Sequence, residues 1–181
     1  MRLFVAVEIE QEIRERIKVF IDKWKPKISN ARWVRAEGLH ITLKFLGNIA
    51  EERRSGIERA LGEIHAPPFP VSLNGIGVFP NSKSPRVLWV GISAGKELAG
   101  LAEEIDEQMA SLGFDREKRA FSPHVTLARF KERANKAEIE AAISVPESNF
   151  GTMTAMEFHL YESKLSPQGS VYEKLSTFRL I

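Results

Sequence analysis

The sequence predicts an α+β fold built from two related halves, and three observations support this fold class. A short pattern occurs twice, as His40-Ile41-Thr42-Leu43 and as His124-Val125-Thr126-Leu127. Each residue of the second copy lies 84 positions after its counterpart (124 against 40), and the same offset aligns residues 4–6 with residues 88–90. Both halves also alternate strand-like apolar runs with helical stripes in the same order. Together these features indicate an internal duplication.

The first half is predicted to alternate strands and helices. Apolar residues at helical spacing mark the first helix, namely Ile13, Ile17, Phe20 and Trp24. Pro26 then stops this helix, and Gly75 and Gly77 suggest a bulge or bend in the last strand. The expected elements are a strand at 3–9, a helix at 10–24, strands at 32–35 and 39–46, a helix within 50–65 and a strand at Phe69–Phe79.

The second half repeats this order after the break Pro-Asn-Ser-Lys-Ser-Pro at 80–85. A helical stripe ends at Gly113, a suitable residue just past a helix C-terminus, and the segment 166–169 has the composition of a turn. The expected elements are a strand at 87–93, a helix over 98–112, a strand at His124–Phe130, a helix at 135–143 and strands at 152–161 and 171–180. We therefore expect one two-lobed domain over residues 1–181, with repeats at approximately 2–79 and 86–181.

Composition excludes several classes of protein. The chain has 181 residues, of which 43% are hydrophobic and 28% charged, as expected for a globular protein with a substantial core. A net charge of +2 is too small for wrapping long nucleic acid but allows a local pocket for a small anion or an RNA end. The absence of cysteine excludes disulfides, thiol catalysis and thiolate metal sites, and fits a cytoplasmic setting. No window reaches membrane-spanning length and the N-terminus lacks a signal-peptide layout, so we expect no membrane partner.

The two motif strands place chemically useful side chains on one face. Side chains at i and i+2 of a strand point the same way, so His40 shares a face with Thr42, and His124 shares a face with Thr126. The intervening apolar residues face the core. If the halves are related by a pseudo-two-fold axis, both imidazoles can lie on either side of one small ligand.

Such a histidine pair suits the hydrolysis of a phosphodiester. Unperturbed histidine titrates near about 6.5, so one ring can act as a base and the other as an acid at neutral pH. The base takes a proton from the attacking water, and the acid protonates the leaving oxygen on the opposite side. Each threonine hydroxyl can donate a hydrogen bond to a phosphate oxygen.

Further substrate contacts are expected next to the motifs. Arg129 could reach a phosphate or a base if its strand ends or bulges, because regular alternation puts it on the core face. Lys44 shares the His40 face if its strand stays regular, and could then contact the anion. Phe45 could stack on a nucleobase, with core packing as the alternative.

The other basic residues are assigned no single functional role. Arg35 and Arg119 are either phosphate-steering cations or plain surface charges. His65 is expected at the surface near a helix end, and His159 on a solvated strand face. Neither of these two histidines is assigned a catalytic role.

The residues quoted so far resemble a known family. HITLKFLG at 40–47 and SPHVTLARF at 122–130 resemble the paired His-x-Thr motifs of the two-histidine (2H) phosphoesterases. Within that group, the start RLFVAVEI, the 84-residue spacing and the ending LYESKLSPQGSVYEKLSTFRL most resemble the bacterial and archaeal RNA 2′,3′-cyclic phosphodiesterases, also called 2′-5′ RNA ligases.

The resemblance implies a bilobal α+β fold, with two antiparallel sheets facing a central cleft and helices outside. It implies hydrolysis of 2′,3′-cyclic phosphates, on RNA 3′ ends or nucleosides, to 2′-phosphates without a metal or other cofactor. In the reverse direction the same site could form a 2′-5′ linkage. His40 would be the proton donor and His124 the proton acceptor, while Thr42 and Thr126 would hold phosphate oxygens. We expect a monomeric, cytoplasmic RNA-processing hydrolase.

Two alternatives remain open at this point. The first is a metal-dependent phosphodiesterase that uses the two histidines as ligands, although the motif faces lack an evident third ligand. The second is a non-catalytic nucleotide or RNA-end binding module, in which the histidines and threonines only bind phosphate.

Overall fold

The elements of the computed structural model follow the predicted order. The structure describes residues 1–146, 148–167 and 169–181. The first half contains β1 (Arg2–Glu8), α1 (Gln11–Trp24), β2 (Ala31–Trp33), β3 (His40–Asn48), α2 (Arg54–Gly62) and β4 (Phe69–Phe79). The second half contains β5 (Val87–Ala94), α3 (Lys96–Ser111), β6 (His124–Phe130), α4 (Lys136–Ile143), β7 (Asn149–Ala155), β8 (Glu157–Ser166) and β9 (Gly169–Arg179). Short 3₁₀ turns occupy Ala36–Gly38 and Glu51–Arg53.

Local sequence signals explain where several elements begin, bend and end. The predicted apolar stripe of α1 is buried, and Gly113 takes a φ of +84° just beyond α3, which confirms its role after the helix. The side chain of Asn135 accepts hydrogen bonds from the backbone N–H groups of Ala137 and Glu138 and so caps α4. A register shift at Gly75, whose φ is +74°, confirms the predicted bulge in β4.

One predicted strand is wrong. The sequence suggested a single strand at 152–161, but the structure has β7 and β8, separated by Met156. β7 pairs with β4, whereas β8 pairs with β1 and β9, so the chain leaves one lobe for the other at Met156. The predicted turn at 166–169 includes Gln168, which lies outside the described residues.

The strands form one curled antiparallel sheet in which the two halves of the sequence are interleaved. Its nine strands run in the order β7-β4-β5-β6-β3-β1-β8-β9, and β2 pairs with β6 beside this path. β1 pairs with β8 from the second half, and β5 pairs with β4 from the first. The two lobes are joined edge to edge through Ile41 and Val125, the one pair of residues that links β3 to β6. The predicted α+β fold with antiparallel strands in two lobes is therefore confirmed, but the two expected sheets are joined into one.

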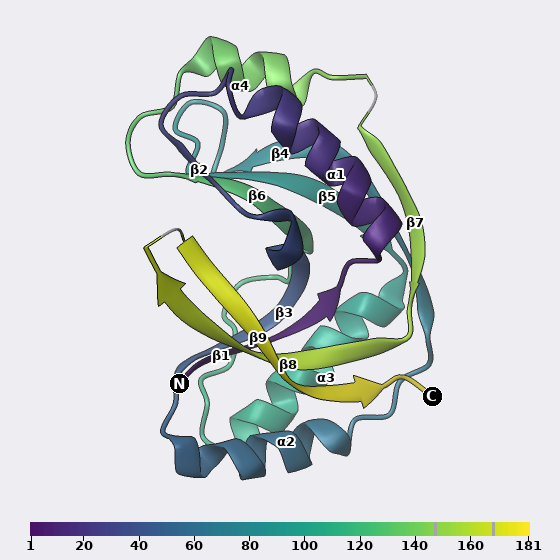
Figure 1. Ribbon diagram of the computed structural model, residues 1–181. Helices are drawn as coiled ribbons and strands as arrows, with labels where there is room; N and C mark the ends of the chain where they lie inside the picture. The colour runs from purple at the N-terminus through teal and green to yellow at the C-terminus, as the bar shows by residue number, and fades with distance from the viewer. Residues whose placement is uncertain (147, 168) are drawn as a thin grey trace.

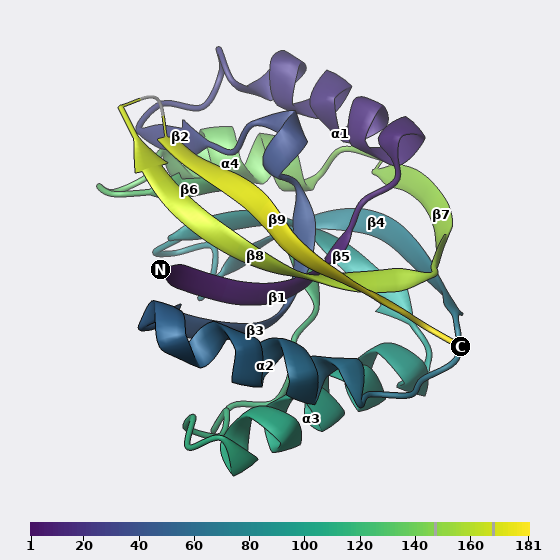
Figure 2. The same ribbon diagram turned by 60° about the horizontal axis from the view of Figure 1, so that its bottom comes forward.

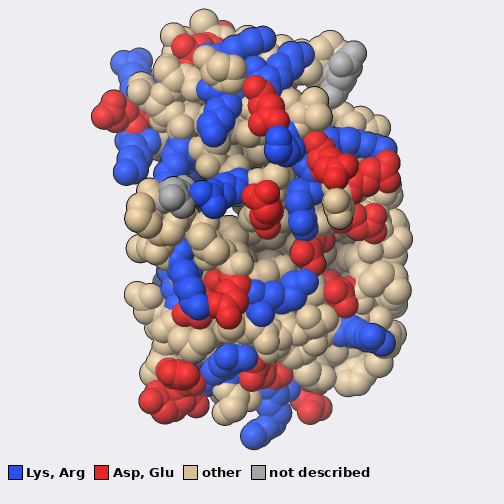
Figure 3. Space-filling view, in the orientation of Figure 1, with Lys and Arg blue, Asp and Glu red and all other residues tan. Residues whose placement is uncertain are grey.

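The helices lie on the outside of this sheet (Figures 1 and 2). α2 and α3 pack beneath the lobe formed by β3, β1, β8 and β9, and α1 and α4 lie over the other lobe. Among the described residues, no helix combines the length and the apolar character needed to cross a bilayer. Acidic and basic side chains are mixed over the face drawn in Figure 3.

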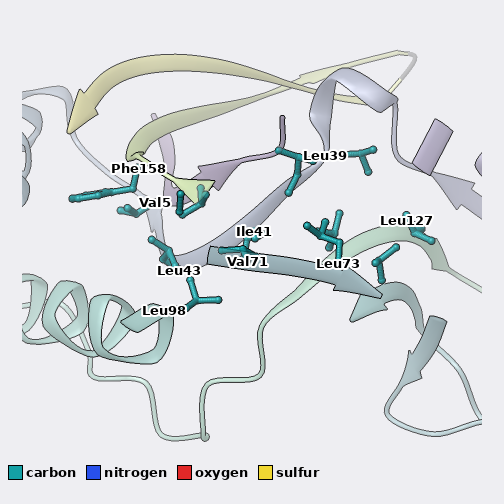
Figure 4. Close-up of a cluster of buried hydrophobic side chains, with 14 of the residues drawn as sticks. Val5, Leu39, Ile41, Leu43, Val71, Leu73, Leu98, Leu127 and Phe158 are labelled. Carbon is teal, nitrogen blue, oxygen red and sulfur yellow. The ribbon is translucent and has the colours of Figure 1, made fainter. Parts of the chain in front are cut away.

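The convex side of the sheet packs against the helices to form the core (Figure 4). Ile41 and Leu43 of β3 point into it together with Leu98 of α3 and Phe158 of β8. Phe158 and Ile41 are completely buried. This burial fixes which side of β3 and β6 faces away from the helices, and therefore which side can hold a ligand.

Both motif strands contain the same irregularity. Along β3 the pairing with β1 skips Leu43, and along β6 the pairing with β5 skips Leu127. Each skipped residue is the extra residue of a β-bulge, which reverses the alternation of the residues after it. The sequence of buried and exposed positions is accordingly identical over 40–46 and 124–130.

Candidate functional site

The structure brings the two motif histidines together. His40 is the first residue of β3 and His124 the first residue of β6. Each is followed directly by a member of the Ile41–Val125 pair that joins the two lobes. Both histidines are partly buried on the side of the sheet away from the core, and Thr42 and Thr126 lie on that side with them.

Each motif ring is held by the same hydrogen bond. The Nδ1–H of His40 donates to the carbonyl oxygen of Gly38 at 2.7 Å, and the Nδ1–H of His124 donates to that of Ser122 at 2.8 Å. A carbonyl only accepts, so this contact keeps the proton on Nδ1. Nε2 is therefore the nitrogen that gains and loses a proton in each ring.

Aromatic side chains surround His40 more closely than His124. The ring of Phe4 lies 4.7 Å from that of His40, and the edge of Tyr172 meets it at 5.1 Å. Among the described residues, the one aromatic ring in contact with His124 is that of Phe79, which is nearly perpendicular to it at a centroid distance of 5.0 Å. Both imidazoles are thus fixed in orientation and partly shielded from water.

Burial and a nearby arginine disfavour the charged form of both rings. Burial lowers the pKa of His40 to about 4, although the hydrogen bond to Gly38 acts in the opposite direction. Burial also lowers the pKa of His124. The positive charge of Arg129 lowers both pKa values further, and that of His124 adds to the effect on His40.

Arg129 therefore belongs to this site, and the bulge explains why. Regular alternation would put it on the core side with Leu127. The extra residue in β6 instead leaves Leu127 and Ala128 both buried and turns Arg129 outward on the histidine side.

The matching bulge in β3 makes the prediction for Lys44 wrong. Both Leu43 and Lys44 point away from the histidine face, and Lys44 is only 8% exposed. Its Nζ donates hydrogen bonds to the Asp106 carboxylate on α3 and to the carbonyl oxygen of Asp115. Lys44 is an internal ion-pair partner and does not lie on the side of the sheet that carries His40.

The side chain of Phe45 is exposed and therefore accessible to a ligand. It occupies the position in β3 that Arg129 occupies in β6, and it is 63% exposed. Its ring centroid lies 6.0 Å from that of Phe4, which in turn contacts His40. Of its two predicted roles, core packing is excluded by this exposure.

The remaining basic residues divide between the site and the surface. Arg35 lines a cavity of about 280 Å³ next to His40. Arg119 is a surface charge, with its side chain 92% exposed and near Glu117. His65 is exposed as predicted.

The prediction for His159 is wrong. It is fully buried in β8, between β1 and β9, and its Nδ1 contacts the hydroxyl of Thr177 at 3.0 Å. Together with Glu8 and Glu157 it forms the one cluster in the described ranges whose ligand atoms are close enough to chelate an ion. That cluster contains neither motif histidine.

Sequence reasoning missed the residues that shape the wall beside His40. Tyr172 is 130 positions away from Thr42 in the chain, and only the pairing of β8 with both β1 and β9 brings it there. A Cβ at Gly38 would lie 3.1 Å from the Tyr172 ring, so a glycine keeps this wall closely packed. The sequence did offer one signal for Gly38, because it lies two positions before His40. Its counterpart in the second copy, Ser122, accepts the equivalent hydrogen bond from His124.

Comparison with known proteins extends over essentially the whole chain. The family model described as "LigT like Phosphoesterase" matches twice, at residues 7–89 and 90–172. A protein of Archaeoglobus fulgidus named RNA 2′,3′-cyclic phosphodiesterase is 40% identical over 178 residues, covering 98% of this chain and 99% of its own length. A protein of the same name from Escherichia coli is 32% identical over 181 residues, covering 99% and 96%.

Solved structures agree with these matches. The crystal structure of E. coli LigT complexed with 3′-AMP has a TM-score of 0.83 and 32% identity, and the alignment covers 99% of this chain and 97% of that one. The crystal structure of TT0787 of Thermus thermophilus has a TM-score of 0.80 and 32% identity, covering 99% and 98%.

Proposed function

This chain belongs to the family of LigT-like phosphoesterases, and we propose that it is an RNA 2′,3′-cyclic phosphodiesterase that opens the cyclic phosphate at RNA 3′ ends or on nucleotides to a 2′-phosphate. The names of its relatives support this reaction. Structures of LigT complexed with 3′-AMP, with ATP and with NADP+ support a nucleotide or RNA end as the ligand. The observation that carries the proposal is the pair of histidines held alike through Nδ1 at the junction of the two lobes.

The proposed reaction needs one neutral and one protonated imidazole. Nε2 of the neutral ring takes a proton from water as the water oxygen forms a bond to phosphorus. The bond between phosphorus and O3′ breaks, and the protonated ring gives its Nε2 proton to O3′. The product has a 2′-phosphate and a free 3′-hydroxyl, and the two rings have exchanged protonation states.

We propose His40 as the donor to O3′ and His124 as the acceptor. Without substrate His40 is neutral near pH 7, because its pKa is about 4. A cyclic phosphate carries one negative charge, and an anion beside Nε2 favours the imidazolium. The donor role of His40 thus requires the bound phosphate.

Three neighbouring side chains are proposed to hold the phosphate. The hydroxyls of Thr42 and Thr126 can donate to its non-bridging oxygens, and Arg129 can donate two parallel hydrogen bonds. These groups would bind most strongly when charge builds up on those oxygens during the attack. Their place on the histidine side of β3 and β6 supports this role.

Substitution of either histidine tests the proposal. We expect His40→Ala and His124→Ala each to lower kcat for a nucleoside 2′,3′-cyclic phosphate by about 10²–10⁴-fold, the usual contribution of a positioned acid or base. His65→Ala is the matched control, because His65 also donates from Nδ1 to a carbonyl two residues earlier but lies at the surface. Chromatography of the product identifies a 2′- or 3′-phosphate.

The same assay distinguishes the alternatives. We propose a metal-free reaction, so a chelator should leave turnover unchanged. Loss of turnover on chelation, restored by one divalent metal, would favour the metal-dependent enzyme instead. Tight binding of a 2′-nucleotide with no turnover of any cyclic phosphate would favour a binding module.

We further propose that the site can also act as a 2′-5′ RNA ligase. If the 5′-hydroxyl of an RNA end replaces water, its oxygen forms a bond to the phosphorus of the cyclic phosphate and the bond between phosphorus and O3′ breaks. Each ring keeps its role: the neutral ring takes the proton of the 5′-hydroxyl, the protonated ring gives its proton to O3′, and the product is a 2′-5′ linkage with a free 3′-hydroxyl. We also propose that the enzyme is monomeric and cytoplasmic, and the lack of cysteine supports the compartment.

A further inference from the structure

Two arginines face each other across the strands next to the proposed reaction site. Arg32 of β2 and Arg129 of β6 are direct cross-strand partners. Like charges at such positions destabilise a sheet. Both side chains are exposed, and within the described parts of the chain neither forms an ion pair with an acidic residue. This pair leaves two cationic groups together at one place.

A cavity lies between these arginines and the wall beside His40. Its volume is about 280 Å³, and its lining includes Arg32, Arg35, Gly38, Arg129, Ser170 and Tyr172. Gly38 and Tyr172 are also the residues that hold and cover His40. The cavity therefore adjoins the proposed reaction site.

The cavity is mainly cationic and continues outward. One acidic residue, Glu37, lines it together with the three arginines. A second, more open cavity shares Arg32 and adds Lys131, opposed by Glu132. The guanidinium of Arg32 also reaches β9, where its Nη2 lies 3.7 Å from the position a Cβ would take at Gly169. Figure 3 shows basic side chains beside the hollow in this face, together with acidic ones.

A cyclic mononucleotide and an RNA end differ in one feature that this cavity can recognise. Both carry the cyclic phosphate, but only the RNA end has a phosphodiester that joins the last nucleotide to the one before it. That phosphodiester is an anion, it lies outside the reaction site, and an arginine can bind it with two hydrogen bonds.

We propose that the cavity at Arg32 is a subsite for this preceding phosphodiester, which makes the enzyme select RNA ends over mononucleotides. This inference rests on the proposed function. Arg32 acts as a specificity-determining residue for the length of the substrate, while Arg129, between the subsite and the histidines, serves the cyclic phosphate.

The test compares three substrates that end in the same 2′,3′-cyclic nucleotide: the mononucleotide, a dinucleotide, and the same dinucleotide with an uncharged methylphosphonate linkage. We expect the dinucleotide to have a kcat/KM about tenfold above that of the other two, mainly through KM, because one charge-assisted arginine contact is at stake. Higher salt should reduce this advantage.

The variant Arg32→Gln should lower kcat/KM for the charged dinucleotide about tenfold and leave the other two substrates within twofold. The control Arg59→Gln removes the same charge from an exposed position on α2 and should change none of them. Equal losses on all three substrates, or no preference of the unaltered enzyme for the charged linkage, would overturn the subsite. If the unaltered enzyme turns over none of the three, the proposed function itself fails.

Discussion

His40 and His124 receive the same hydrogen bond but lie in different surroundings. Both donate from Nδ1 to a carbonyl two residues earlier. The duplicated sequence predicted that each histidine shares a strand face with its threonine, but it did not predict this hydrogen bond. The sequence does not reveal that Phe4 and Tyr172 enclose one ring while Phe79 meets the other, because these aromatic residues come from distant strands. The two rings are therefore alike in hydrogen bonding and unlike in surroundings, and burial lowers the pKa of both.

The lowered pKa values of both histidines predict that activity is highest at acidic pH. Since burial and Arg129 lower both pKa values below 6.5, the state with one neutral and one protonated ring is most populated below pH 6.5. We expect kcat/KM to be highest there and to fall as rising pH removes the remaining imidazolium. Arg129→Gln should lower the rate and also move the profile to higher pH, because it removes a charge that disfavours both imidazolium ions.

The profile is measured with the cyclic mononucleotide and the control Arg59→Gln. A profile with its maximum well above pH 7, or one that Arg129→Gln leaves in place, would contradict this reading of the site.

At the scale of elements, the twin bulges in β3 and β6 decide which residues face the ligand. Regular alternation predicts Lys44 at the site and Arg129 in the core, and the structure has the reverse. A signal was present in the sequence, because apolar residues follow three positions after Leu43 and Leu127, at Leu46 and Phe130. The helices were predictable because several turns of apolar spacing support each one, whereas a bulge changes one residue.

Substitution of Lys44 tests this assignment. Lys44→Met leaves the buried carboxylate of Asp106 without its main partner. Burial alone would raise the pKa of Asp106, but the hydrogen bonds from Lys44 and from the Glu117 backbone N–H lower it. We expect the free energy of unfolding to fall by about 2–3 kcal/mol, less than for a fully uncompensated charge because Arg116 remains beside Asp106.

Urea unfolding measures this loss, and kcat/KM per folded molecule should stay within twofold. A large fall in kcat/KM with unchanged stability would instead indicate that Lys44 contacts the substrate.

For the molecule as a whole, the exchange of strands ties the two sequence repeats into one unit. β1 needs β8 as a neighbour, and β5 needs β4. The duplication was visible from the 84-residue offset, but the exchange was not, because it depends on which strand edges meet in space. Element order alone is equally compatible with two lobes that each contain one repeat.

A split of the chain within 80–85 tests this dependence. We expect fragments 1–84 and 85–181 each to lack stable tertiary structure, since each exposes unpaired strand edges and part of the core. Mixed or co-expressed, they should recover both the circular dichroism of the intact chain and its turnover. Independent cooperative unfolding of either fragment would show that the repeats are separate folding units.

Phe45 and Arg129 occupy matching positions after the two bulges, yet one is aromatic and the other cationic. A five-membered cyclic phosphate offers two ester oxygens on neighbouring carbons, and a site with perfect two-fold symmetry would accept it in two orientations. If Phe45 stacks on the base and Arg129 binds the phosphate, the unlike pair would remove that degeneracy, because the base and the cyclic phosphate would then occupy opposite ends of the site. The choice of which ester oxygen leaves can thus depend on one pair of positions that differ between the repeats, while the two histidines that transfer protons remain the same in both.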